Sequence, residues 1–140
     1  MRQGWDIIRG GGDVLAALEA CADHSETFAS WIEANLPKWG VQRNEAVRRS
    51  RLNSTFAYQI LAGTRHASRD KLIQLAFGLH LGIDDACELL ERGGVNALCP
   101  TARRDVVLAW CLHNGLDIAR CDDLLWSLGE KTLVGPEAGS

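Results

Sequence analysis

The stretch from Gly40 to Arg65 restricts the fold most, because it holds too few large apolar residues to form a core of its own. Asn53 is a good helix N-cap, and Gly63 favours the left-handed conformation that ends a helix. The pattern therefore predicts two short helices, over about 42–50 and 53–62, joined by a tight turn. Such a unit must pack on neighbouring helices. Its apolar or small positions are Val41, Ala46, Val47, Leu52, Ala57 and Ile60.

Basic residues are concentrated in and around this stretch. Residues 36–71 carry eight Lys or Arg and two Asp or Glu, a balance of +6. The rest of the chain carries seven Lys or Arg and sixteen Asp or Glu, a balance of −9, and the two parts together give the net charge of −3. A concentrated basic region beside a polar helix face is the electrostatic footprint expected of nucleic-acid binding. The alternative is a basic face that is merely solvated, formed by Arg48, Arg49 and Arg51.

The same stretch resembles the lambda-repressor-like (XRE-type) helix-turn-helix family, whose pattern runs roughly G-L-S-Q-E-E-L-A-x-x-x-G-V-S-x-x-T-I-S-x-I-E-x-G. The pattern lies on Gly40 through Gly63 without a gap, and the resemblance covers about residues 28–91. It implies an all-α fold with a five-helix DNA-binding domain. Arg51 stands where the family usually has glycine, which predicts a left-handed arginine in the turn. The positions that match in kind are Gly40, Val41, Glu45, Leu52, Ile60 and Gly63.

The resemblance also implies roles for the polar residues. In this family the second helix of the unit reads base edges in the major groove, and the flanking residues touch phosphates. The implied base-reading residues are Ser54, Thr55 and Gln59. With the neighbouring basic residues included, the implied phosphate-binding residues are Arg43, Arg48, Arg49, Tyr58, Thr64 and Arg65. Gln59 suits a bidentate pair with adenine, and Phe56 suits either a thymine methyl or a partner protein.

Helical spacing of apolar residues extends the all-α prediction to the rest of the chain. Ser25 is expected to cap a helix that ends before Pro37, and Ser68 to cap a later helix. Asp13 is expected to open an additional N-terminal helix. The predicted parts are an N-terminal arm and helix (1–24), the helix-turn-helix domain (25–94), a C-terminal helix pair (95–133) and a disordered tail (134–140).

The C-terminal pair repeats the segment before it. RDKLIQLAFGLHLGIDDACELLE begins at Arg69, and RDVVLAWCLHNGLDIARCDDLLW begins at Arg104. The Arg-Asp, Leu-His, Gly, Cys and Leu-Leu elements recur in the same order. Repeated helix pairs bury surface that neither pair buries alone, so we expect the second pair to stack on the first and enlarge the core.

Tryptophans are numerous for a chain of this length. Helical spacing places Trp31, Trp110 and Trp126 at core positions. Trp39 lies in the loop before the central unit, where it serves either as a lid over the core or as an interaction residue.

The sequence carries no pattern that predicts an enzyme, a metal site or a cofactor. The spacings of His80 to Cys87 and of His113 to Cys121 match no compact zinc motif. No nucleophile motif or phosphate-cradling loop is present. The five cysteines lack a C-x-x-C, and Cys21, Cys87 and Cys111 lie on apolar faces of predicted helices, which suits reduced core residues. No apolar run is long enough to span a membrane and no signal-peptide pattern opens the chain, so a cytoplasmic location is expected.

These observations predict a sequence-specific DNA-binding transcriptional regulator that binds double-stranded DNA as a homodimer, since half-sites double the contact. The alternative is a protein-interaction adaptor on the same scaffold, which has lost DNA binding. The overall acidity, the outward Phe56 and Tyr58, and the extra helix pair favour that alternative.

Overall fold

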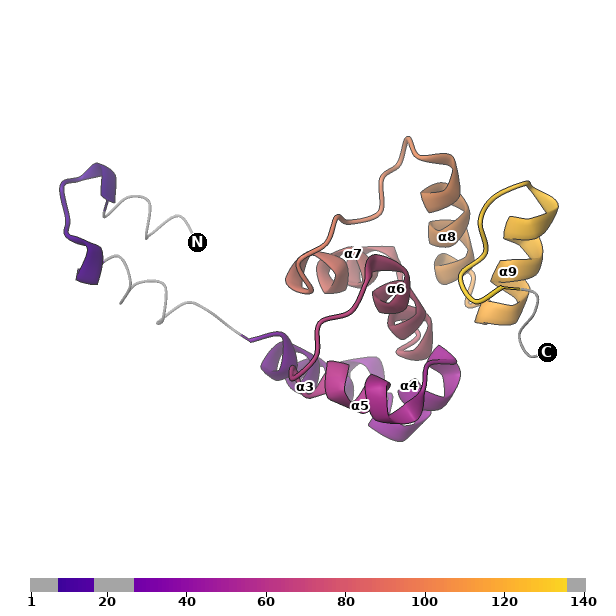
Figure 1. The fold of residues 1–140 in the computed structure, drawn as a ribbon, viewed down its shortest axis with the longest axis horizontal. Coiled ribbons are helices and arrows are strands. Elements are labelled where there is room, and N and C mark those ends of the chain that lie inside the picture. Colours follow the sequence, from indigo (N-terminus) through magenta and orange to yellow (C-terminus); the bar gives the residue numbers. More distant parts are fainter. Residues whose placement is uncertain (1–7, 17–26, 136–140) are drawn as a thin grey trace.

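The computed structural model describes residues 8–16 and 27–135, and within them it is helical and contains no strand. The expected all-α fold is confirmed for this part of the chain. Seven helices have both ends inside these residues and are labelled α3 to α9 in Figure 1. Their bounds are α3 Phe28–Trp39, α4 Arg43–Ser50, α5 Ser54–Leu61, α6 Arg69–Gly78, α7 Ile83–Arg92, α8 Arg103–His113 and α9 Ile118–Ser127. Among the described residues, no helix combines the length and the apolar character needed to cross a membrane.

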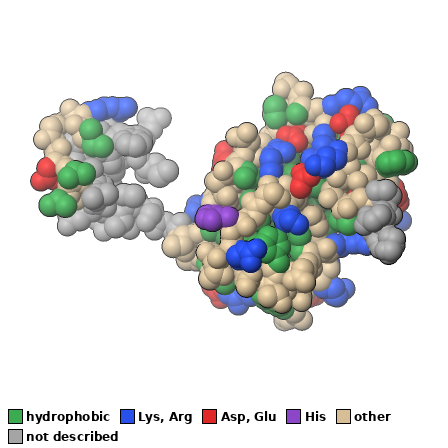
Figure 2. All heavy atoms as spheres, in the orientation of Figure 1, with side chains coloured by type: hydrophobic (Ala, Val, Ile, Leu, Met, Phe, Trp, Pro, Cys, Tyr) green, Lys and Arg blue, Asp and Glu red, His purple; other side chains and the backbone are tan. Residues whose placement is uncertain are grey.

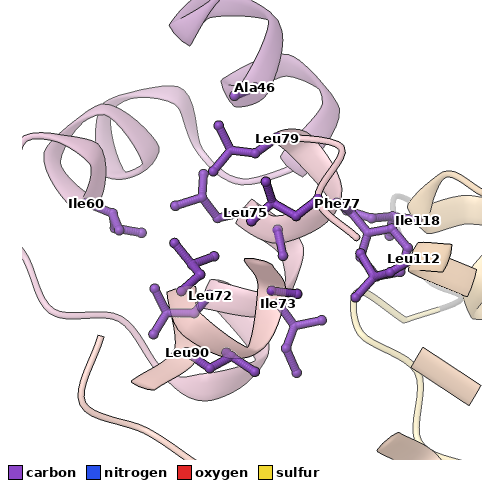
Figure 3. Packing of buried hydrophobic residues seen from close by; sticks show 14 of the residues in the cluster. Ala46, Ile60, Leu72, Ile73, Leu75, Phe77, Leu79, Leu90, Leu112 and Ile118 are labelled. Carbon is purple, nitrogen blue, oxygen red and sulfur yellow. The ribbon is translucent and has the colours of Figure 1, made fainter. Parts of the chain in front are cut away.

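Helix α6 lies at the centre of the core. Every residue from Leu72 to Leu79 is buried, and the helix packs against α4 on one side and α7 on the other. Figure 3 shows Leu75 and Leu79 directed toward α4 and α5, while Phe77 points toward Leu112 and Ile118 of the C-terminal pair. Buried residues of α8 and α9 belong to the same cluster as those of α3 to α7. The C-terminal pair therefore enlarges one core, as the repeat predicts.

Helices α4 and α6 approach closely because Gly78 has no side chain. A Cβ built at this position would lie 2.2 Å from the Ala46 carbonyl oxygen and 3.1 Å from the Ser50 Cβ. Two further bonds tie the end of α4 to α6. Gln74 is buried and its Nε2 donates to the Ser50 carbonyl oxygen at 3.0 Å, and Arg49 Nε donates to the Gly78 carbonyl oxygen at 3.1 Å. The position of α4 is thus fixed by both packing and polar bonds.

The turn between α4 and α5 has the predicted left-handed arginine, with φ of 60° at Arg51. Asn53 caps α5 as predicted, because its Oδ1 accepts the Phe56 N–H at 3.0 Å. Gly63, with φ of 79°, follows the helix end at Ala62. A left-handed arginine costs about 1 kcal/mol, so the packing around the turn holds it against its own preference.

The prediction that Pro37 ends the first helix of this region is wrong. Helix α3 continues through Pro37 to Trp39 and stops at Gly40, whose φ is 66°. The Gly40 N–H donates to the Pro37 carbonyl oxygen at 3.1 Å and the Val41 N–H to the Leu36 carbonyl oxygen at 3.3 Å. Proline removes one N–H donor from the helix, but its carbonyl oxygen still accepts the hydrogen bond that closes the helix end. The helix therefore ends at the left-handed Gly40 and not at the proline.

The N-terminal predictions are described only in part. Residues 14–16 are helical, and the Ala16 N–H donates to Asp13 Oδ1 at 2.8 Å, which is the capping role predicted for Asp13. The rest of that helix and the predicted cap Ser25 lie outside the described residues. Thr27 caps α3, since its Oγ1 accepts the Ser30 N–H at 3.0 Å.

The two repeats are joined by reciprocal ion pairs between their Arg-Asp dipeptides. Arg69 donates to both carboxylate oxygens of Asp105 at 2.7 and 3.2 Å, and Arg104 donates to both oxygens of Asp70 at 2.9 and 3.1 Å. The equivalent dipeptides of the two repeats therefore bind each other, which fastens the C-terminal pair to α6.

Asp105 is the buried member of this network. Burial alone would raise its pKa, but hydrogen bonds from Arg69 and from the Cys99 N–H, with the charges of Arg69 and Arg104, hold the pKa of this carboxyl below its ordinary value. Arg69 also donates to the carbonyl oxygens of Asn96 and Ala97 at 2.9 and 3.1 Å. The segment between α7 and α8 is thus fastened to the first turn of α6.

Two of the three tryptophans predicted for the core are on the surface. Trp31 is buried, but Trp110 is 54% exposed and Trp126 is 70% exposed. The prediction was wrong because the buried face of each helix lies at another register: Trp110 is two residues from the buried Leu108, and Trp126 follows the buried Leu125.

Trp39 is the last residue of α3, so the prediction that it lies in a loop is wrong; it is half-buried and packs against the core. Its ring packs edge-on against Trp31 at 5.4 Å, and its Nε1 donates to Asp85 Oδ2 at 3.2 Å. Two residues of the predicted disordered tail, Val134 and Gly135, are hydrogen-bonded to the rest of the chain. Val134 and Gly135 are held by Asp122, at 2.9 and 3.4 Å from their N–H groups to its Oδ2, and residues 136–140 lie outside the described residues.

Candidate nucleic-acid interface

Helix α5 offers a polar face to solvent. Ser54, Thr55 and Tyr58 are exposed, whereas Ala57 and Ile60 are buried against the core. The inward and outward sides are those that the sequence predicts. The helix begins after the Asn53 cap and packs against α3 and α4. Its outward side chains are therefore attached to a backbone that this packing fixes in place.

Open hollows lie on both sides of α5, so the helix forms a ridge. We call them the Phe56 hollow, about 710 Å³, and the Tyr58 hollow, about 690 Å³. The Phe56 hollow is lined by Arg51, Leu52, Asn53, Thr55, Phe56, Gln59, Arg65, Lys71, Gln74, Leu133 and Val134. The Tyr58 hollow is lined by Glu33, Leu36, Pro37, Gly40, Val41, Gln42, Arg43, Asn44 and Tyr58.

The Phe56 hollow is cationic. Among the described residues that line it are Arg51, Arg65 and Lys71, and none is Asp or Glu. The Arg65 guanidinium carbon lies 5.1 Å and the Lys71 Nζ 5.4 Å from the centre of the Phe56 ring, within the range of cation–π attraction. On the face drawn in Figure 2, Lys and Arg side chains gather around a hydrophobic patch where α5 and α6 meet. The aromatic ring therefore collects positive charge beside the ridge.

Gln59 and Thr64 are joined to this cationic group. Arg65 donates through its terminal nitrogen to Gln59 Oε1 at 3.3 Å, and the Thr64 hydroxyl donates to the Gln59 carbonyl oxygen at 3.2 Å. Gln59 is half-buried, in contrast to the exposed Thr55. The hydrogen bond from Arg65 thereby orients the side-chain amide of Gln59, and the NH₂ group of that amide can donate to an acceptor outside the helix.

The Tyr58 hollow carries a compensated charge. Arg43 forms an ion pair with Glu33, and both side chains are about half exposed, at 47% and 59%. Tyr58 is 42% exposed and borders the same hollow. An exposed pair of this kind is worth about 0–1 kcal/mol, so an anion of higher charge can displace Glu33 from Arg43.

The two arginines of α4 have different surroundings. Arg48 is exposed, whereas Arg49 is half-buried between the Gly78 carbonyl oxygen and Glu45, whose Oε2 lies 3.9 Å from the Arg49 terminal nitrogen. Burial and the nearby Arg49 charge also lower the pKa of His80 below its ordinary value. Arg49 is thus turned toward the end of α6 and away from the two hollows.

The structure therefore divides the predicted residues into groups. Thr55, Gln59 and Arg65 share the Phe56 hollow, and Arg43 and Tyr58 share the Tyr58 hollow. Ser54 opens α5, Thr64 lies beyond its C-cap Ala62, and these two residues, like Arg48 and Arg49, line neither hollow.

The sequence did not assign roles to Lys71, Gln74, Leu133 or Val134, all of which line the Phe56 hollow. Lys71 lies within the basic stretch, but its side of the helix follows from how α6 packs. The two tail residues are more than seventy positions from α5, so local patterns carry no sign of them.

Other chemistry finds little support in the described residues. They contain no cluster of three or more His, Cys, Asp or Glu arranged to hold a metal ion. Cys111 is buried as predicted, Cys87 is only partly buried, and Cys121, which was not predicted for the core, is buried as well. Cys21 lies outside the described residues. Burial raises the pKa of the Cys111 and Cys121 thiols. Comparison of the chain with family models, curated proteins and solved structures gives no match.

Proposed function

We propose that the chain is a sequence-specific DNA-binding regulator of transcription, in which α4 and α5 act as a helix-turn-helix. The observation that carries the proposal is the α5 ridge with a cationic hollow beside it. A B-DNA major groove is about 12 Å wide and admits one helix, and the two phosphate backbones then lie on either side. A ridge between two open hollows supports docking of this kind.

Each part of the ridge has a role in this proposal. Thr55 and Ser54 contact base edges from the first turn of α5, and Gln59 pairs with a base through its amide. Arg65, held by Gln59 and Phe56, binds a phosphate of one strand. Arg43 binds a phosphate of the other strand after it leaves Glu33.

Lys71 and Arg51 join the phosphate contacts of the Phe56 hollow, although the sequence alone did not assign them. Arg49 is not given a direct phosphate contact, because its guanidinium bonds to the end of α6. A regulator of this class works on cytoplasmic DNA, and one copy buries too little surface for tight binding. We therefore include a homodimer on two half-sites in the proposal.

The test is binding of a mixed-sequence duplex, followed by fluorescence anisotropy across a salt series. Five cationic side chains, Arg43, Arg48, Arg51, Arg65 and Lys71, are available to phosphates in one copy, which corresponds to a slope of about −4.5 in log affinity against log salt. Lack of binding even at low salt would remove the DNA proposal.

A protein-interaction adaptor is the second candidate, favoured by the exposed Trp110 and Trp126 on the C-terminal pair. Exposed aromatic residues are enriched at protein interfaces. The adaptor function predicts no salt-dependent binding to duplex, and it predicts that substitution of either tryptophan weakens partner capture while the ridge residues are unimportant.

A further inference from the structure

Residues 131–135, here called the strap, leave α9 and are anchored at their start by Arg104. Arg104 Nε donates to the Lys131 carbonyl oxygen at 2.8 Å and its terminal nitrogen to the Thr132 carbonyl oxygen at 3.4 Å. The same guanidinium holds Asp70 of α6. The beginning of the strap is thus fixed to both repeats.

The far end of the strap is held by one carboxylate. The Leu133 N–H donates to Asp122 Oδ1 at 2.6 Å, the Val134 N–H to Oδ2 at 2.9 Å, and the Gly135 N–H to Oδ2 at 3.4 Å. Hydrogen bonds to an ionised carboxylate are stronger than neutral ones, so Asp122 governs whether this end stays in place.

The strap borders the ridge. Leu133 and Val134 line the Phe56 hollow together with Thr55 and Gln59, and Val134 and Gly135 also lie with Arg51 around a smaller pocket on α9. Leu133 and Val134 are apolar and no Asp or Glu among the described residues lines the hollow, so the strap contributes occupied space there and no charge. A phosphate backbone entering from this side meets the side chains of the strap.

We propose that the strap is an autoinhibitory contact, which must leave Asp122 before a duplex can occupy the Phe56 hollow. This inference rests on the proposed function. The apparent affinity of such a protein for duplex is its intrinsic affinity multiplied by the fraction of molecules in which the strap is open. If the strap is open in about one-tenth of the molecules, duplex binding is about tenfold weaker than for a protein whose strap is always open.

The test compares Asp122→Asn with the matched control Asp123→Asn. Both changes remove one negative charge from α9, but of these two carboxylates it is Asp122 that accepts the N–H groups of Leu133, Val134 and Gly135. We expect Asp122→Asn to bind a mixed-sequence duplex about tenfold more tightly than Asp123→Asn at the same salt. A chain that ends at Thr132, which keeps the two carbonyl oxygens bound by Arg104, should show the same gain.

Amide hydrogen exchange at Leu133 and Val134 supplies the independent readout. These amides should exchange faster in Asp122→Asn than in Asp123→Asn. Because coupling is reciprocal, saturating duplex should also speed their exchange in the unaltered protein.

The outcomes separate this inference from the proposed function. If the two Asn variants bind duplex with equal affinity, or if the Leu133 and Val134 amides stay protected in the complex, the autoinhibitory role of the strap is overturned. The DNA-binding proposal stands in either case. No duplex binding by any variant at low salt overturns both.

Discussion

Replacing Gly78 with Ala tests the contact that holds α4, and with it the α5 ridge, against α6. The added Cβ would lie 2.2 Å from the Ala46 carbonyl oxygen and 3.1 Å from its carbon. Both atoms belong to the backbone, so the two helices must separate by about 1 Å, because no side chain can turn aside. Overpacking of this kind costs about 3 kcal/mol, whereas alanine gains about 1 kcal/mol over glycine within a helix. We expect a net loss of about 2 kcal/mol in the free energy of unfolding.

Urea unfolding followed by far-UV circular dichroism measures this loss as a lower midpoint at an unchanged slope. Gly82→Ala is the control, since a Cβ there meets nothing within 4 Å. Gly82 is the N-cap of α7, where alanine is a poorer cap, so the control should lose less than about 1 kcal/mol. A Gly78→Ala protein as stable as Gly82→Ala would refute the close approach of α4 and α6 described here.

Two further predictions follow from named contacts. Gln59→Ala should reduce the discrimination between bases at one position of the binding site by about 1–3 kcal/mol, whereas Arg43→Ala should weaken binding to all sequences alike. A competition assay with a series of base-substituted duplexes distinguishes the two effects. Uniform loss of affinity in both variants would contradict the assigned roles. Because the folded-state pKa of Asp105 is lowered, its contribution to stability is present above the unfolded pKa and is lost as pH falls through the folded pKa. Asp105→Asn should therefore flatten the loss of stability in acid, as measured by urea unfolding from pH 7 downward, while Asp84→Asn, an exposed control, should keep the dependence of the unaltered protein.

Features governed by neighbouring residues could be predicted from the sequence. The cap at Asn53, the left-handed Arg51 and the stop near Gly63 each depend on a few adjacent positions, and each is observed. The repeat of the Arg-Asp dipeptides was also visible, because equivalent residues recur at a fixed spacing. Local rules were therefore enough for the existence and ends of α4 and α5.

Features governed by the packing of distant elements could not be predicted in this way. The exposure of Trp110 and Trp126 depends on which face of α8 and α9 meets the core, and a bulky residue at helical spacing does not fix that register. Arg49 lies in a basic run that suits phosphate binding, but its direction is set by the carbonyl of Gly78, twenty-nine residues away. The sequence pattern assigned the candidate site to α5, and that assignment stays a prediction, whereas the part of the Phe56 hollow that comes from α6 and the strap could not be read from local patterns.

The reciprocal pairing of the two repeats also restricts where a second copy can bind. In the structure the Arg69–Asp70 edge of α6 is matched by Arg104–Asp105 of α8, and all four charges are engaged within one chain. Breaking such pairs to exchange them with another copy would expose partly buried charges for no gain in contacts. The proposed homodimer must therefore use another surface. Val106 and Trp110, which lie four residues apart on α8, form an apolar face that is exposed among the described residues of the single chain.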